Sequence, residues 1–225
     1  MSLSPGLLFD PSGIHTLKTR IQTQDWANRF WQSVQQKLDE ALATDVVLPP
    51  RGGNWFHWHA SPTTGAALEV GKQIGPWEWE HIDPVGGDIF RGDPSEPSKD
   101  FDGCMIRILH YEWCEQIRDL GVAYQVTGDV RYAKRAREIV LAYAEKYLEY
   151  PFHNTRGEEK IGGGRVGPQT LNEAVWIISV CHGTDLIWDI LSEQDKKTIA
   201  EKMLLPAARE VILPHEMKVH NIQCW

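Results

Sequence analysis

The residues best suited to chemistry stand at the end of the sequence, where His220 and Asn221 are neighbours and Trp225 follows them. An amide side chain such as that of Asn221 can hydrogen-bond a carboxylate and stabilise charge that spreads onto it in a reaction. The intrinsic pKa of histidine lies near neutrality, so His220 could serve as an acid, a base or a second donor. Structural roles remain open for both, because Asn commonly caps a helix and His220 could simply face solvent or pack.

A second group of candidate residues opens a predicted helix. A glycine-rich loop over 162–167 precedes a helix that Pro168 suits as its first turn, and Arg165 and Gln169 flank this start. A helix N-terminus favours anions, so both side chains could hold a carboxylate or a sulfate of a ligand. The alternative is a loop anchored by polar contacts. Trp176 is a further candidate for ligand binding, although it also fits the apolar stripe of the helix.

A third group is the aromatic run over 54–59, which reads Asn-Trp-Phe-His-Trp-His. Flat aromatic surfaces beside titratable donors suit stacking on sugar rings, and we assign this role to His57 and Trp58. Tryptophans more often fill cores than bind ligands, so packing remains the alternative for Trp58. Two histidines spaced as H-x-H are weak evidence for a metal. We therefore predict no metal site and no cofactor.

Apolar side chains recur at helical spacing through most of the chain, which predicts an all-α fold. A helix, or two shorter ones, is expected over 17–43. Two antiparallel helices follow over 106–127 and 130–150, with Asp129 as the cap of the second. Another pair is expected from 168 to 191 and from a capping box at 192–195 to 211, and a further helix from about 219. Repeated hairpins of this kind indicate an incomplete (α/α) toroid.

The segment over 49–103 shows no sustained period and carries about half of the Pro and Gly together with four tryptophans. Loops of this length are uncommon in compact domains and tend to be functional. We expect an ordered, aromatic-rich excursion from the helical scaffold with few strand signals, most exposed over 93–100.

Composition narrows the classes of function. The chain has 225 residues and a formal net charge of −8, which together with the lack of a dense basic run argues against a nucleic-acid partner. A local anion site remains compatible with this charge. No apolar run is long enough to span a bilayer. The four cysteines lack metal-site spacing, and we expect buried free thiols. We predict a single domain over 1–225; oligomeric state is left open.

Two stretches resemble the heparinase II/III and alginate lyase superfamily of polysaccharide lyases: Gly-Arg-Val-Gly-Pro-Gln-Thr-Leu-Asn-Glu-Ala-Val-Trp over 164–176 and His-Asn-Ile-Gln-Cys-Trp over 220–225. The resemblance implies an N-terminal toroid portion, with the remaining helices and a β-sandwich domain expected to be missing. It also implies β-elimination on a uronic-acid polysaccharide, alginate or heparin-like, with Asn221 facing the cleft. Family members that carry His directly after this Asn place Ile222 there, so His220 is not a matched catalytic histidine.

The same resemblance places the catalytic base and acid, usually Tyr or His, beyond Trp225. Met1-Ser2-Leu3 looks like an expression leader. We therefore expect a fragment that is inactive by itself, from a bacterial protein that is periplasmic or secreted, with the cytoplasm as the alternative. The expected partner is an acidic polysaccharide or oligosaccharide, with neither nucleic acid nor a membrane involved.

Two other functions stay open. Glu112, Glu115 and Asp119 share one side of a helix and could suggest the paired carboxylates of a glycoside hydrolase on the same scaffold. Such acids more often form a solvated face. The chain could also be a non-catalytic carbohydrate-binding domain.

Overall fold

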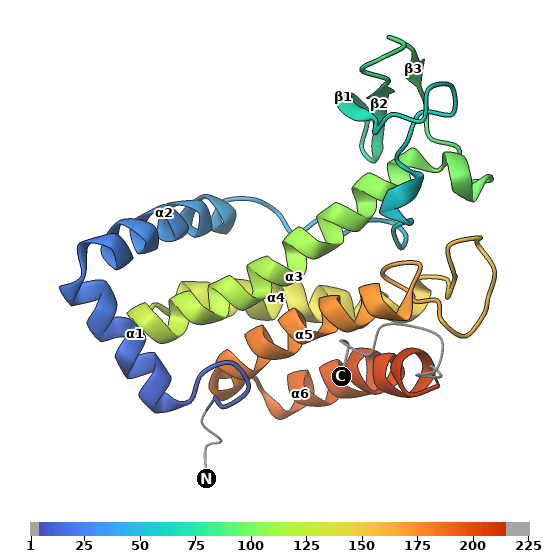
Figure 1. Cartoon of the computed structure of the whole chain (residues 1–225). Helices are drawn as coiled ribbons and strands as arrows, with labels where there is room; N and C mark the ends of the chain where they lie inside the picture. Colours follow the sequence, from blue (N-terminus) through green and yellow to red (C-terminus); the bar gives the residue numbers. More distant parts are fainter. Residues whose placement is uncertain (1–4, 215–225) are drawn as a thin grey trace. The chain divides into compact units, whose positions relative to one another are not determined.

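The computed structural model describes residues 5–214, and their tertiary contacts group into two compact units. Of the described residues, the first unit comprises 5–48, 112–145 and 177–204, and the second comprises 49–111, 146–176 and 205–214. Helices dominate both the described chain and Figure 1, which confirms the all-α class. The single domain and the toroid stay predictions, and the helix expected from about 219 lies outside the described residues.

The N-terminal helical segment of the first unit consists of two helices, α1 (Pro11–Thr23) and α2 (Asp25–Leu42). The side chain of Asp10 accepts a hydrogen bond from the N–H of Gly13 at 2.7 Å, which caps α1. Extended backbone at Gln24 separates the helices. The apolar stripe that predicted them is only partly buried, because Trp26 and Phe30 are 61% and 67% exposed.

The helical hairpin predicted around Asp129 is confirmed. Helix α3 spans Phe101–Thr127 and α4 spans Val130–Lys146. Gly128 makes the turn with φ +74, a conformation that costs glycine little, and Asp129 accepts a hydrogen bond from the N–H of Arg131 at 2.9 Å. The α4 side chains that fill the core include Tyr132, Ala133, Ala136, Ile139, Val140 and Tyr143.

The next pair begins with α5 (Thr170–Leu186), whose last turns belong to the first unit. There α5 approaches α3 closely: a Cβ on Gly183 would stand 2.6 Å from the carbonyl carbon of Ile117. Helix α6 (Glu193–Ile199) starts with the predicted capping box of Ser192 and Asp195. Wider π-type turns continue it over Ala200–Leu204 and Ala207–Ile212, on either side of Pro206.

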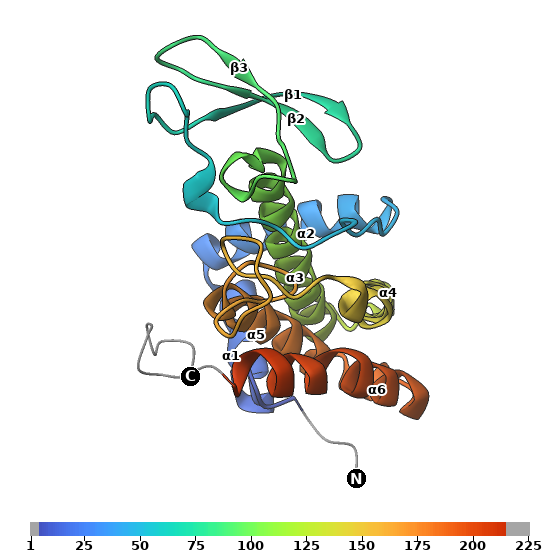
Figure 2. The same cartoon turned by 90° about the vertical axis from the view of Figure 1, so that its right-hand side faces the viewer.

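A small antiparallel sheet in the second unit was not predicted, because the sequence over 49–103 carries few strand signals. Its strands are β1 (Glu69–Gly75), β2 (Glu78–Ile82) and β3 (Ile89–Phe90), in the order β1-β2-β3. In both views the sheet lies beyond the N-terminal end of α3 (Figures 1 and 2). Most β1 side chains are exposed or half-buried, so the strand carries no alternating apolar pattern that would have revealed it.

Shorter elements complete the described chain. Single 3₁₀ turns occur over Phe56–Trp58, Pro97–Lys99, Tyr147–Glu149 and Trp188–Ile190. As predicted, residues 93–99 are largely exposed, but Asp100 is buried. Cys104, Cys114 and Cys181 are free thiols, the first two buried and the third half-buried. Within residues 5–214, none of the helices has the length and apolar character that crossing a membrane requires.

Candidate functional site

The carboxyl group of Glu173 organises the loop before α5 in the second unit. Its oxygens accept hydrogen bonds from the hydroxyl of Tyr147 at 2.5 Å and from the N–H groups of Val166 at 2.9 Å and Arg165 at 3.1 Å. Burial raises the pKa of the fully buried Glu173, and these donors oppose the rise by stabilising the ionised form. A single side chain of α5 therefore fixes the path of the loop.

Trp176 lies behind this carboxyl group, where it is completely buried and stacks on Tyr147 with ring centroids 5.8 Å apart. Burial, followed by the nearby Glu173, raises the pKa of Tyr147, so its hydroxyl stays a donor at neutral pH. Trp176 offers no surface to a ligand in this arrangement. The prediction that it binds substrate is wrong, and the packing alternative describes it.

The side chain of Arg165 stabilises the loop and is not presented on an open surface. Its guanidinium group donates to the carbonyl oxygen of Tyr150 at 2.8 Å and to the carboxylate of Glu210 at 2.9 Å, and its side chain is only 16% exposed. Gln169, which directly precedes α5, is half-buried, and its side chain makes no hydrogen bond to any residue from 5 to 214. Of the two residues predicted to bind an anion here, Gln169 is therefore the available one.

The loop before α5 is closed on itself at its base. His153 and Gly164 exchange two backbone hydrogen bonds, of 2.9 and 3.0 Å. A Cβ on Gly163 would stand 2.4 Å from the carbonyl oxygen of His153, so only glycine fits this position. The two ends of the segment between 153 and 164 are therefore held together.

The aromatic run folds into the 3₁₀ turn Phe56–Trp58. The indole N–H of the half-buried Trp58 donates to the carbonyl oxygen of Thr155 at 3.1 Å, which ties the turn to residues 151–157. Phe56 and His57 are exposed, and the ring of His57 lies 4.8 Å from that of Trp55, edge to face. The turn presents aromatic surface to solvent, as the sugar-stacking hypothesis requires, but this does not test that hypothesis.

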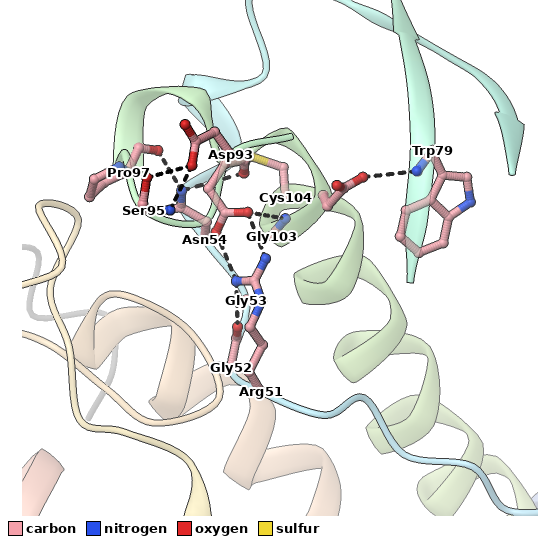
Figure 3. A network of polar contacts seen from close by, with 12 residues as sticks. Arg51, Gly52, Gly53, Asn54, Trp79, Asp93, Ser95, Pro97, Gly103 and Cys104 are labelled. Atoms are coloured by element: carbon pink, nitrogen blue, oxygen red, sulfur yellow. Dashed lines mark hydrogen bonds and ion pairs between the residues drawn. The ribbon is translucent and has the colours of Figure 1, made fainter. Parts of the chain in front are cut away.

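Sequence analysis missed a fork of two hydrogen bonds between Arg51 and Asp100. The two terminal guanidinium nitrogens of Arg51 contact the two carboxylate oxygens of Asp100 at 2.8 and 2.6 Å. The N–H of Gly103 also donates to Asp100 at 2.9 Å, and Asn54 donates to the carbonyl oxygen of Pro97 at 2.6 Å. Figure 3 shows these contacts gathering the start of α3 and residues 51–54 into one network. The partners lie 49 positions apart, so no local pattern links them.

A second buried network missed by sequence analysis joins two histidines and an aspartate. Nε2 of His59 lies 2.9 Å from Nδ1 of His81, and Nε2 of His81 lies 3.0 Å from a carboxylate oxygen of Asp102. Asp102 also accepts the N–H of Trp79 at 2.9 Å, which attaches β2 to α3. Burial, reinforced by His81 and opposed by Asp102, lowers the pKa of His59 to about 4. With all three side chains buried, the network fastens the sheet to the helix.

Other residues considered for chemistry are less well placed. Glu112 and Glu115 are exposed, and Asp119 pairs with Arg118 at 2.8 Å. Partial burial, with a contribution from Glu115, raises the pKa of Glu112. Throughout residues 5–214, no three His, Cys, Asp or Glu side chains gather in a way that could hold a metal ion. His220, Asn221 and Trp225 lie outside the described residues.

Comparison with protein-family profiles finds no match. The chain is 37% identical over 130 residues to a protein of Saccharophagus degradans named exo-oligoalginate lyase, an alignment that covers 56% of this chain and 17% of that protein. It is 35% identical over 108 residues to a protein of Stenotrophomonas maltophilia named alginate lyase, covering 47% of this chain and 14% of the relative. The chain thus spans less than a fifth of either relative. These similarities support a polysaccharide lyase family.

Proposed function

We propose that this chain forms the N-terminal helical part of a polysaccharide lyase that cleaves a uronic-acid polymer by β-elimination, with alginate as the first candidate and heparin-like polymers as the second. The observation that carries the proposal is the 37% identity over 130 residues to an exo-oligoalginate lyase. Helical hairpins such as α3–α4 are the building blocks expected of a toroid of this family, which makes the toroid part of the same proposal.

The chemistry requires three groups around a 4-linked uronate. A donor neutralises the C6 carboxylate, a base removes the C5 proton, and an acid protonates O4 as the C4–O4 bond breaks and the C4–C5 double bond forms. We assign carboxylate neutralisation to Asn221, with His220 as an assisting donor. The base and the acid would come from sequence after Trp225.

Among the described residues we assign substrate binding to Gln169. Its amide has no hydrogen-bond partner among residues 5–214, while Glu173 and Tyr147 hold the adjoining loop in one conformation. Because the backbone of the loop is already fixed, binding a saccharide has to order only the side chain of Gln169, which limits the entropic cost of binding. Arg165 contributes indirectly, by fixing the loop through Tyr150 and Glu210.

The test is ultraviolet absorbance of unsaturated uronate formed by the full-length protein from alginate, heparan and chondroitin-type polymers. We expect unsaturated product from at least one of them, loss of about two orders of magnitude in kcat for Asn221→Ala, and an increased KM for Gln169→Ala. Gln22→Ala, which alters an exposed amide of α1, is the matched control. The isolated 225-residue chain is expected to form no product.

The outcome also separates the alternatives. Absence of unsaturated product from all three polymers would refute the lyase proposal. Release of reducing ends without unsaturation, abolished by changing Glu112 or Glu115, would establish a hydrolase instead. Binding of oligosaccharide without any cleavage by the full-length protein would point to a carbohydrate-binding domain.

A further inference from the structure

A cleft of about 160 Å³ opens in the second unit between three segments, residues 51–54, 94–100 and 151–157. One water needs only about 10–15 Å³ of such space, so the cleft has room for a group much larger than a single solvent molecule. Its walls include Arg51 and His153 as well as several prolines. The cleft therefore combines a cationic side chain with apolar surface, which is the usual composition of a small-ligand site.

Arg51 supplies the donors. Its guanidinium group makes three hydrogen bonds, two to Asp100 and a long one of 3.4 Å to the carbonyl oxygen of Gly52. Arginine carries five N–H groups, so two remain for a ligand. The side chain is 33% exposed while that of Asp100 is 7% exposed, which leaves Arg51 as the accessible member of the pair. The fork orients the guanidinium plane in advance, as bidentate recognition of a carboxylate requires.

His153 lines another wall of the same cleft. Its Nδ1 lies 2.9 Å from the carbonyl oxygen of Pro151, and its Nε2 lies 2.9 Å from the carbonyl oxygen of Gly53. Both ring nitrogens therefore face backbone carbonyl groups, which fix the orientation of the imidazole in the wall of the cleft.

Aromatic surface adjoins the cleft. The turn Phe56–Trp58 follows the lining residue Asn54 after one position, and Trp58 is bonded to Thr155, the neighbour of the lining residue Asn154. Phe56 and His57 face solvent there. A guanidinium group with two free N–H groups beside exposed rings fits a ligand that is both anionic and ring-shaped, because the carboxylate and the sugar face are recognised by different groups.

We propose that this cleft is a subsite for an acidic monosaccharide of the polymer, additional to the site of Asn221, in which Arg51 binds the carboxylate and the fixed ring of His153 forms a wall of the cleft. The proposal rests on the proposed function for its choice of polymer. Such a subsite raises affinity for the chain without taking part in bond cleavage. Its signature is therefore a change in KM with little change in kcat.

The test uses the full-length protein with a series of alginate oligosaccharides. His153→Gln replaces the fixed imidazole ring, and Pro94→Trp places a large side chain from an exposed position into the cleft without removing any hydrogen bond of the network. Each variant is expected to raise KM about tenfold for the longer oligosaccharides, with kcat changed by less than about twofold. His15→Gln, an exposed histidine of α1, is the control.

Unchanged KM in both variants, with unchanged thermal denaturation, would overturn the subsite while leaving the lyase proposal intact. If the parent protein forms no unsaturated product, the proposed function fails, and calorimetry then decides the subsite separately. The probes are a trimannuronate and neutral mannotriose. Binding of the acidic trisaccharide alone, weakened by His153→Gln and Pro94→Trp, supports the subsite, and equal heats for both probes refute it.

Discussion

Replacing Glu173 offers the sharpest test of how the loop before α5 is held. Glu173→Ala removes the acceptor of three hydrogen bonds and leaves the buried N–H of Val166 and the hydroxyl of Tyr147 without it. A buried donor that loses its partner costs about 1–3 kcal/mol, so we expect a total loss of about 3–5 kcal/mol in the free energy of unfolding. Urea denaturation followed by circular dichroism measures this loss.

Glu173→Gln distinguishes the hydrogen bonds from the charge. The amide oxygen can accept from the two backbone N–H groups while the amide nitrogen donates to the hydroxyl oxygen of Tyr147, so the loss should stay below about 1 kcal/mol. Burial raises the folded-state pKa of Glu173 above its ordinary 4.5. The unfolded chain therefore releases this proton first, and the parent loses stability as pH rises from about 4.5 toward the folded pKa. Glutamine does not titrate, so the free energy of unfolding of Glu173→Gln should increase relative to that of the parent as pH rises through that window.

A local measurement separates loop opening from global unfolding. Residues 156–161 are exposed and include Arg156 and Lys160, both sites for trypsin. Under native conditions Glu173→Ala should be cleaved there faster than the parent, whereas Glu173→Gln should not. A cost below about 1 kcal/mol for the alanine variant, with unchanged cleavage, would refute the view that this carboxyl group anchors the loop.

Two further predictions concern packing and acid stability. The pKa of His59 is lowered from 6.5 to about 4 in the folded state, so protonation favours unfolding as pH falls through that window. This group alone should lower the free energy of unfolding by about 2 kcal/mol between about pH 7 and pH 5. His59→Gln should reduce the drop without abolishing it, since burial also lowers the pKa of His110 to about 4; an unchanged drop in urea titrations would contradict this. Gly183→Ala should destabilise the chain by about 1–3 kcal/mol, since its Cβ would stand 2.6 Å from the backbone of Ile117. The control Gly6→Ala has open space and should cost less than about 0.5 kcal/mol, and equal melting temperatures for both variants would argue against close packing of α3 and α5.

The helices could be predicted because their signals are local. Asp129 and Ser192 cap helices through contacts within three positions, and the buried stripe of α4 repeats with the helical period. The sheet could not, because β1 is largely exposed and its pairing with β2 depends on tertiary attachment through His81 and Asp102. Exposed strands lack the alternation of apolar and polar residues from which a strand is predicted.

The candidate site was predictable in part. The loop before α5 was recognised from its glycines. Whether Arg165 is free to bind a ligand depends on its contacts with Tyr150 and Glu210, which are 15 and 45 positions away in the sequence. The same holds for Trp176. An aromatic residue in the apolar stripe of a helix has the same sequence spacing whether it packs in the core or binds a ligand. The cleft at His153 depends on carbonyl groups of the backbone, whose positions no side-chain pattern encodes.

The paired backbone hydrogen bonds between His153 and Gly164 bear on where the chain can accept insertions. Once the two ends of a segment are joined, the entropic cost of a longer segment grows only logarithmically, by about 0.6 kcal/mol for each doubling of its length. The exposed tip over 156–161 is therefore where insertions should be tolerated best. Variation in length at this tip could adapt the rim of the neighbouring cleft to polymers of different shape while α5 and its anchor at Glu173 stay as they are.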